Sequence, residues 1–409
     1  MEILDCSMPM TFDTYSRCSF NCMYCFSYFQ KSHCCSGYLG GQVRAVNPER
    51  IKAMFTNILS GNVKALSKSN RQFIPYVRSR KMMQWGALAD QFDQYEKRHG
   101  LTLDLLRFFD KIDYPLSFST KSVWWTKDER YMELVRRHAH NWHFKVSIIT
   151  DDPAKARKIE RGVPKPDERI EAIRRLSEAG VHVTLRLRPY IIGASDDWRN
   201  LLSKAANAGA DSVSTEFFCL EIRADEALKA RYAKMSEVVG FDILEFYKTN
   251  SKQKGYKRLS EGIKRPILTA MRDEARRLGM RFHVSDAHCR DLNDGVNCCG
   301  VPPDWNYCRN HFGGAIALAK AKGIVTFGEL NPEIKALFGN FTWHDATGYN
   351  EGGNRQWAQQ YYTTMADWFR INWNKTKAGA CPLNMYGKLL RPKGKDTEGN
   401  IIYEYIGPK

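Results

Sequence analysis

Short apolar segments alternate with longer amphipathic segments over the first half of the chain. The apolar segments predict strands at 8–15, 81–85, 114–120, 144–150, 181–187 and 211–218. Between them, apolar residues recur at helical spacing and predict helices at 48–60, 102–112, 128–138, 166–179 and 196–207. Strict alternation of strand and helix is typical of parallel strands joined by right-handed crossovers.

This pattern predicts an α/β fold, in which residues 1–220 form a partial (β/α)6 barrel similar to a TIM barrel. Ligands of such barrels gather at the C-terminal ends of the strands. The pattern changes near residue 221. We expect residues 221–409 to form a mixed C-terminal lobe that contains cysteines and binds substrate. Its segments predict helices and one strand, at 224–239, 244–247, 267–278 and 280–284.

Composition limits where the protein works. The chain has 409 residues, of which 43% are hydrophobic, which supports a packed core. No apolar run approaches the ~18 residues needed to cross a membrane. The N-terminus has no basic segment followed by an apolar one, so we expect no secretory signal and a cytoplasmic location. Twelve cysteines in a reducing compartment indicate metal chemistry.

The formal net charge of +17 indicates an anionic partner. Lysines and arginines gather in three runs, at 64–81, 252–265 and 375–395. Any one run is typical of a solvated surface. Three runs, with aromatic residues interleaved in the last, favour DNA as the partner.

Cys18, Cys22 and Cys25 have CxxxCxxC spacing and directly follow the first predicted strand. Three thiolates on one tight loop can hold three irons of a [4Fe–4S] cluster and leave the fourth iron open. A structural zinc site usually needs a fourth ligand, and the nearby candidates are His33, Cys34 and Cys35. A disulfide needs an oxidising compartment. The spacing favours the cluster.

Several later segments of the chain follow one another in an order and at a spacing that can be compared with known families. They are Gln84–Glu96, Ser119–Ser122, Val146–Thr150, Glu160–Arg169, Glu178–Val181 and Arg188–Gly193. With the cysteine motif, they resemble the spore photoproduct lyase-like branch of the radical S-adenosylmethionine (SAM) superfamily. The resemblance covers about residues 8 to 220. It implies a partial (β/α)6 barrel in which SAM binds the open iron by its amino and carboxylate groups.

The resemblance also implies a set of SAM-binding residues. They are Tyr24, Asp90, Lys121, Ser147, Arg188 and Ile192. Asp90 stands where the family has a Gly-Gly-Glu-like element, and it could instead cap a local turn. Lys121 could instead reach solvent, and Ser147 could be a buried hydroxyl bonded to backbone. Arg186 and Arg188 alternate with leucines, so both face one side of their strand, and we expect Arg188 to point into the barrel.

A second group of cysteines comprises Cys289, Cys298, Cys299 and Cys308. One hypothesis is an auxiliary iron–sulfur cluster, and another is zinc held by three of these thiols with His288 or His311. A third hypothesis is that one of these cysteines donates a hydrogen atom from its thiol to a substrate radical. Cys298 and Cys299 are the candidates in this group. Cys219, at the end of the sixth strand, is a further candidate. All four could also be inert.

These observations favour a radical SAM enzyme, of the isomerase or lyase class, that abstracts hydrogen from a thymine base in DNA. We expect it to rearrange or modify the 5-substituent, as in hypermodified phage DNA. Repair of a thymine photolesion, action on a peptide or small molecule, and a zinc-bearing nucleic-acid-binding protein are the alternatives. Flavodoxin or ferredoxin is the expected electron donor. Aromatic residues available to stack on a flipped base are Trp124, Trp125, Tyr361, Tyr362, Trp368 and Trp373.

Overall fold

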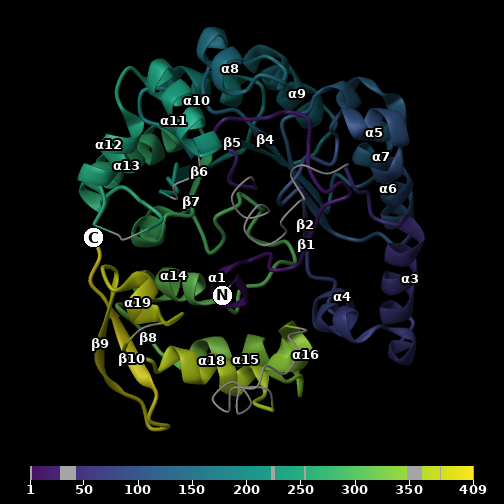
Figure 1. Ribbon diagram of the computed structural model, residues 1–409. Coiled ribbons are helices and arrows are strands. Elements are labelled where there is room, and N and C mark those ends of the chain that lie inside the picture. The colour runs from purple at the N-terminus through teal and green to yellow at the C-terminus, as the bar shows by residue number, and fades with distance from the viewer. Residues whose placement is uncertain are drawn as a thin grey trace.

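A curved parallel sheet forms the centre of the molecule (Figure 1). The computed structural model describes residues 2–27, 43–222, 226–252, 255–347, 362–377 and 379–408. The sheet has seven strands in the sequence order β1 to β7, every neighbouring pair parallel. The strands are β1 (Thr11–Phe12), β2 (Met83–Trp85), β3 (Leu116–Thr120), β4 (Trp142–Ser147), β5 (Val183–Tyr190), β6 (Ser212–Phe217) and β7 (Arg281–Val284).

The predicted α/β class and partial barrel are confirmed, with one strand more than the six expected in the barrel. β7 comes from the segment 280–284, which we assigned to the C-terminal lobe, and it pairs in parallel with β6. Two boundaries differ most: two residues of the predicted 8–15 form β1, and the helix predicted at 267–278 begins at Glu261.

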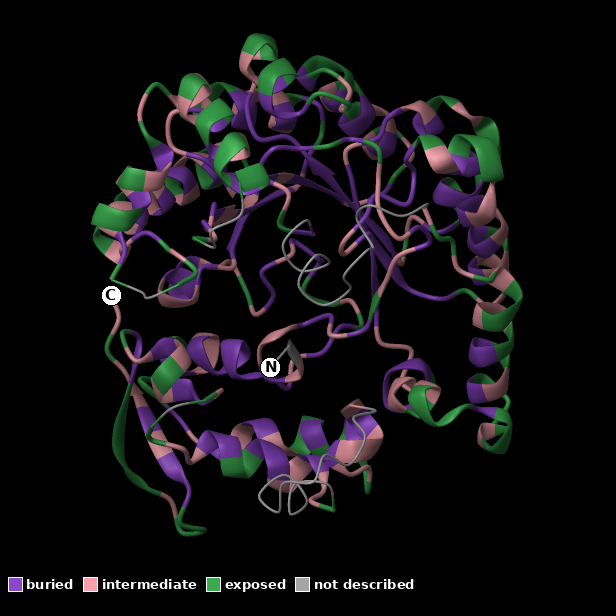
Figure 2. Cartoon of the chain, in the orientation of Figure 1, coloured by how far each residue is buried: buried purple, intermediate pink, exposed green. Residues whose placement is uncertain are grey.

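Helices cover the outer, convex side of the sheet (Figure 1). Those of the first half are α3 (Pro48–Leu59), α4 (Ile74–Arg78), α5 (Gln94–His99), α6 (Leu101–Lys111), α7 (Glu129–Arg137), α8 (Pro153–Ile159), α9 (Pro166–Glu178) and α10 (Trp198–Asn207). Side chains cap several of them: Asn47 accepts from the Arg50 amide at the start of α3, and Asp128 from the Arg130 amide at α7. The strands are buried and the outward helix faces are exposed (Figure 2).

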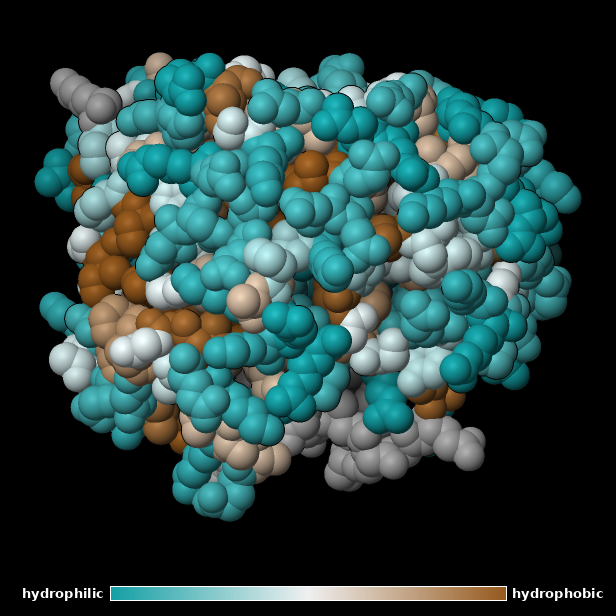
Figure 3. All heavy atoms as spheres, turned by 90° about the horizontal axis from the view of Figure 1, so that it is seen from above, coloured by the Kyte–Doolittle hydropathy of each residue, from teal (hydrophilic) through white to brown (hydrophobic). Residues whose placement is uncertain are grey.

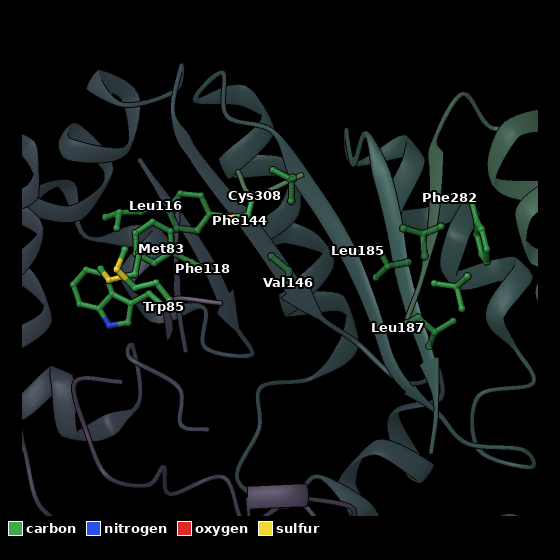
Figure 4. Close-up of a cluster of buried hydrophobic side chains, with 14 of the residues drawn as sticks. Met83, Trp85, Leu116, Phe118, Phe144, Val146, Leu185, Leu187, Phe282 and Cys308 are labelled. Carbon is green, nitrogen blue, oxygen red and sulfur yellow. The ribbon is translucent and has the colours of Figure 1, made fainter. Parts of the chain in front are cut away.

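Side chains on the outward side of the strands pack beneath these helices. Trp85, Phe118 and Phe144 stack across β2, β3 and β4, with ring centroids 5.5 and 4.6 Å apart (Figure 4). Leu185 and Leu187 continue this layer on β5 and are fully buried. Burying one large apolar side chain is worth about 1.5–3 kcal/mol. This layer fixes which residues of each strand face the barrel interior, because alternate side chains point to opposite sides.

The rest of the chain forms further helices and a small antiparallel sheet. The helices are α11 (Glu226–Val239), α12 (Ile243–Asn250), α13 (Glu261–Arg277), α14 (Phe312–Lys322), α15 (Phe327–Phe338), α16 (Trp343–Thr347), α18 (Met365–Trp373) and α19 (Pro382–Tyr386). The sheet comprises β8 (Ile324–Val325), β9 (Leu390–Lys395) and β10 (Ile401–Tyr405) in the order β8-β10-β9.

The N-terminal helix α1 (Glu2–Asp5) connects the two parts of the molecule. Asp5 accepts a hydrogen bond from the Tyr386 hydroxyl of α19 and lies 3.2 Å from the Arg290 guanidinium. None of the described helices is both long and apolar enough to span a bilayer. The face shown in Figure 3 is predominantly hydrophilic, with smaller apolar areas between the polar side chains.

Candidate functional site

The three cysteines of the CxxxCxxC motif line a cavity at the C-terminal end of the parallel strands. The cavity has a volume of about 100 Å³. Its wall combines the cysteine loop with residues that follow β2 and residues of β3, β4 and β5: Cys18, Phe20, Cys22, Tyr24, Cys25, Phe26, Ser27, Gly86–Asp90, Ser119–Lys121, Ser147, Arg186, Arg188 and Pro189. The predicted position of the motif at this end of the barrel is therefore confirmed. His33, Cys34 and Cys35 lie outside the described residues.

Hydrogen bonds hold the cysteine loop at several points. The Met23 amide donates to the Ile159 carbonyl at 2.9 Å, and the Gly162 amide donates to the Phe20 carbonyl at 3.2 Å. At the start of the loop, the amide and hydroxyl of Ser19 donate to Asp93 at 2.8 and 2.7 Å. The loop is thus attached to segments that follow β2 and β4, so its shape is set by the barrel.

A buried chain of polar groups continues from the loop to β4. The Tyr24 hydroxyl donates to Glu160, and Glu160 pairs with the Arg169 guanidinium at 2.7 Å. Arg169 also donates to the Ser147 carbonyl at 2.7 Å. Glu160 and Arg169 are almost completely inaccessible to solvent. Because each buried charge has a partner, the chain can fix Tyr24 and Ser147 relative to each other.

Five of the six residues predicted to bind SAM line this cavity, namely Tyr24, Asp90, Lys121, Ser147 and Arg188. The Lys121 ammonium lies 5.7 Å from the centre of the Tyr24 ring, next to the cysteine loop. Ile192 is not among the lining residues. It belongs to a turn in which the Gly193 amide donates to Asp196 at 2.9 Å. Contact between Ile192 and a ligand stays a prediction.

The Asp90 carboxylate is occupied by its own surroundings. It accepts from the Lys121 amide at 2.6 Å, the Phe92 amide at 2.9 Å and the Thr120 hydroxyl at 3.0 Å. Burial raises the pKa of Asp90 to about 6, although these hydrogen bonds act in the opposite direction. The turn-capping alternative therefore accounts for the position of Asp90, which links the loop after β2 to the end of β3.

Three residues that shape the site were absent from the sequence predictions. Asp13 accepts from the Leu88 and Ala89 amides at 3.1 and 3.0 Å and thereby fixes the loop after β2. Gly86 has φ +83°, and a Cβ there would lie 2.5 Å from the Ser119 carbonyl oxygen. Phe26 lines the cavity and remains 42% exposed. Their positions directly after β1, β2 and Cys25 were the only signals available from the sequence.

Two arginines of β5 point into the barrel, as the alternation with leucine predicts. Both line the cavity. Arg188 forms an ion pair with Glu216 of β6, while Arg186 donates to the Ser119 hydroxyl of β3. Burial lowers the pKa of Arg186 to about 10, and the neighbouring charge of Arg188 adds to this effect. The inner wall is therefore strongly positive.

The second cysteine group does not converge on one point. Cys298 and Cys299 are adjacent, with their sulfur atoms 3.9 Å apart. In the part of the chain that the structure describes, no three thiol or imidazole ligand atoms of this group lie within 4.8 Å of one another. His311 is excluded further, because its two ring nitrogens interact with the Ser7 hydroxyl and the Gly314 amide. The described residues thus form no zinc site here, and an auxiliary cluster gains no support.

Cys298 and Cys299 lie inside the barrel, close to its positive wall. The pKa of Cys299 is lowered because Cys298 donates to it and Lys145 stabilises the thiolate. Cys219 lies elsewhere, with its thiol 3.5 Å from the Phe217 carbonyl, and burial raises its pKa to about 12. Neither the pair nor Cys219 is among the residues lining the cavity. A hydrogen-donor role for any of them stays a prediction.

A different set of possible metal ligands lies at the opposite end of the strands. Of the described side chains, only Asp113, His138 and His140 bring three such ligand atoms within 4.8 Å. These residues precede β3 and β4, whereas the cysteine loop follows β1. His138 already interacts with Asp110 at 2.8 Å, so hydrogen bonding alone accounts for its position.

Three of the six aromatic residues considered for stacking on a base belong to the core. Trp125 and Trp373 are fully buried, and Trp368 is 8% exposed. Core packing accounts for these three rings, so they are not available to stack on a base. Trp124 is half-buried, with its indole N–H donating to the Phe92 carbonyl at 2.7 Å, and Tyr362 is 78% exposed. Tyr361 lies outside the described residues.

The three basic runs also differ in their surroundings. In the first, the side chains of Lys64, Lys68, Arg71 and Arg78 are exposed. The second is largely used within the fold, since Lys264 pairs with Asp286 and Arg265 with Asp291, at 2.6 and 2.8 Å. In the third, Lys388 pairs with Glu261, and Arg391 and Lys393 pair with Glu404. The first run is therefore the strongest candidate for contact with DNA.

The cysteine loop suits an iron–sulfur cluster. Three thiols on one clamped loop face a cavity, and no described residue supplies a fourth thiol to the cavity wall. Burial raises the pKa of Cys18 to about 12. Thiolates at such positions depend on a bound metal for their charge to be stabilised. Ligation by these three thiols would leave one iron of a [4Fe–4S] cluster open toward the cavity.

Fold and site together define a parallel partial barrel whose first strand is followed by a three-cysteine loop. The chain has a fold similar to that of spore photoproduct lyase, which confirms the resemblance at the level of fold. A cysteine-to-serine variant of spore photoproduct lyase superposes with a TM-score of 0.50 at 17% sequence identity. The alignment covers 68% of this chain and 77% of that one.

Two further solved structures are similar. Spore photoproduct lyase complexed with dinucleoside spore photoproduct has a TM-score of 0.48 and 17% identity, over 66% of this chain and 75% of the other. SuiB of Streptococcus suis bound to its precursor peptide SuiA has a TM-score of 0.43 and 12% identity, over 70% and 51%. No protein-family model matches the sequence, and no curated protein does either.

Proposed function

We propose that the protein is a radical SAM enzyme in which Cys18, Cys22 and Cys25 hold a [4Fe–4S] cluster and the adjoining cavity binds SAM. One observation carries this proposal: the cysteine loop and five of the six predicted SAM-binding residues line the same cavity. They come from the loop after β1, the loop after β2, and strands or strand ends of β3, β4 and β5.

The cluster and SAM, when bound, supply a 5′-deoxyadenosyl radical that removes hydrogen from a carbon no ordinary base could deprotonate. The chain's own residues bind and orient. We assign the carboxylate of SAM to Lys121, and the position of its ammonium beside the cysteine loop supports this assignment. Because Asp90 is occupied by backbone amides, carbonyl groups of the cavity-lining loop after β2, rather than the Asp90 carboxylate, would accept from the SAM amino group. Tyr24 and Ser147 are held by the buried Glu160–Arg169 pair.

For the substrate we propose a thymine base in DNA whose 5-substituent is rearranged or modified. The net charge of +17 and the exposed basic run from Lys64 to Arg78 support a polyanionic partner. A fold neighbour is described in complex with a dinucleoside photoproduct, which makes thymine photolesion repair the second candidate. Phe26, exposed at the cavity wall, is available to stack on a flipped base.

The proposal is tested by measuring 5′-deoxyadenosine after anaerobic reconstitution with iron and sulfide. The protein is incubated with SAM and a reductant, either dithionite or a flavodoxin or ferredoxin as the proposed physiological donor. Four reactions are compared: no DNA, plain DNA, DNA carrying a thymine photolesion, and DNA carrying an amino-acid-substituted thymine. We expect the last of these to increase 5′-deoxyadenosine most.

The other outcomes are equally informative. Greatest stimulation by the photolesion DNA would replace modification by repair. Slow cleavage of SAM that no DNA accelerates would support the radical SAM chemistry. It would indicate that the substrate is a peptide or small molecule rather than DNA. No cleavage by a brown, iron-loaded protein would contradict the proposed activity, and a colourless zinc-loaded protein would support the nucleic-acid-binding alternative.

A further inference from the structure

Arg186 and Lys145 are two cations on the inner wall of the barrel whose hydrogen-bond partners are neutral. Arg186 donates to the Ser119 hydroxyl, and Lys145 donates to the side-chain oxygen of Gln84. Across the described ranges, no carboxylate lies within the 4.0 Å limit of an ion pair with either cation. Arg188 differs, because it is paired with Glu216.

The two cations are charged at neutral pH in spite of their surroundings. Burial lowers the pKa of Lys145 to about 8, and burial together with Arg188 lowers that of Arg186 to about 10. The Cys299 thiolate acts in the opposite direction on both, and the Glu216 carboxylate does so on Arg186. A bound anion would favour the charged forms further, since opposite charges at short range stabilise each other strongly in a partly buried site.

Only Arg186 of these two reaches the cavity. It lines the wall together with Ser119, whereas Lys145 is 2% exposed and lies behind that wall. The Gln84 amide group joins them, since its nitrogen donates to the Ser119 hydroxyl at 3.0 Å. The guanidinium is therefore held in position from one side, with a second positive charge behind it.

We propose that Arg186 binds a carboxylate carried by the substrate, with Ser119 and Gln84 fixing the guanidinium and Lys145 adding charge from behind. The planar guanidinium matches a carboxylate through two parallel hydrogen bonds. Lys121, beside the cysteine loop, is a separate cation available to SAM. This inference rests on the proposed function and narrows its substrate to a thymine with an acidic, amino-acid-like 5-substituent rather than a neutral one.

The test compares two DNA oligonucleotides of equal size. One carries a thymine with a glycine substituent, and the other carries the corresponding glycinamide, which lacks only the negative charge. Dissociation constants are measured by fluorescence anisotropy at fixed salt for the iron-reconstituted protein. The variants are Arg186→Gln, Arg186→Lys and, as a surface control with a half-exposed side chain, Arg174→Gln.

We expect the unsubstituted protein to bind the acid about tenfold more tightly than the amide, the scale of one charge-assisted hydrogen-bonded pair. Arg186→Gln is expected to bind both oligonucleotides equally. Arg186→Lys keeps the positive charge and should restore part of the preference. Arg174→Gln should keep all of it. Thermal melting of each variant establishes that it is folded.

Two results would overturn the subsite. One is equal binding of acid and amide by the unsubstituted protein, as expected if the guanidinium met a DNA phosphate. The other is an Arg186→Gln variant that loses affinity for SAM alone, measured by calorimetry, while its acid preference is unchanged. A preserved preference without 5′-deoxyadenosine formation would support the subsite and contradict the radical chemistry, so the two proposals fail separately.

Discussion

Arg169 and Glu160 form an ion pair 2.7 Å long in a position almost closed to solvent. Glu160 also accepts from Tyr24 of the cysteine loop, and Arg169 donates to the Ser147 carbonyl at the end of β4. The pair therefore connects the cysteine loop to the cavity wall. The ion pair stabilises the fold and also fixes the positions of Tyr24 and Ser147, both of which line the cavity.

Replacing Arg169 by methionine should destabilise the protein by about 3–5 kcal/mol, because Glu160 is left as an unpaired buried charge. Chemical denaturation of the reconstituted protein measures the change. The matched control is Arg174→Met on the same helix, where Arg174 and Glu171 are both 47% exposed and the expected loss is below about 1 kcal/mol. Similar losses for both variants would contradict the role of the buried pair.

Alanine at Cys18, Cys22 or Cys25 should abolish retention of the cluster, because each thiol is a proposed iron ligand. Iron analysis and the absorbance near 400 nm, which is typical of such clusters, measure retention. Cys308→Ala and Cys289→Ala are the controls and should keep about four irons per chain, the content of one [4Fe–4S] cluster. If the unsubstituted protein instead held about eight irons per chain and a control variant about four, an auxiliary cluster would again explain the second cysteine group.

The barrel could be predicted from the sequence because its strands are short segments with apolar residues at alternating positions and its helices are amphipathic. β7 was predicted as a strand, but its membership of the sheet depends on pairing with β6, which is 64 residues earlier in sequence (281 minus 217) and leaves no local signal. The inward direction of Arg186 and Arg188 followed from their alternation with Leu185 and Leu187, and the cavity bears it out.

The errors have a common physical origin. Trp125 and Trp373 were considered for stacking on a base and Lys264 was assigned to a basic run, yet burial depends on contacts with distant segments. Lys264 is neutralised by Asp286, and the Trp373 indole donates to the Ile401 carbonyl. Likewise, four cysteines within twenty residues suggested one metal site, but the fold separates Cys289 and Cys308 from the Cys298–Cys299 pair.

A thiol that donates hydrogen to a substrate radical should carry solvent deuterium into the product, because thiol protons exchange with water. We expect deuterium in the product formed in D2O and its loss in Cys298→Ala, since Cys298 keeps the proton that it donates to the Cys299 thiolate beside it. Cys219→Ala should retain the label. Mass spectrometry of the digested DNA gives the result. Loss of the label in Cys219→Ala alone would assign the donor to the end of β6.

The exposed basic run should contribute directly to DNA affinity. Replacing Lys64, Lys68 and Arg71 by glutamine removes up to three phosphate contacts, so the slope of log K against log salt should become shallower by about two to three. The control replaces Arg391, Lys393 and Lys388, which are paired with carboxylates, and should change the slope by less than one. Equal slopes for the unsubstituted protein and the first variant would place the DNA elsewhere.

Acid should destabilise the fold through its buried histidines. His283 is fully buried on β7, and burial lowers its pKa from its ordinary value of 6.5 to about 4. The unfolded chain therefore binds a proton below pH 6.5 that the folded chain does not, and stability is lost as the pH falls from 6.5 toward 4.

Between pH 7 and pH 5, His283 alone should account for a loss of about 2 kcal/mol. In His283→Asn, which can still donate to the Asn297 carbonyl as His283 Nδ1 does at 2.9 Å, the loss over this interval should be smaller by that amount. Urea denaturation at the two pH values measures it. A His283→Asn variant with the same pH dependence as the unsubstituted protein would show that His283 takes up its proton in the folded state.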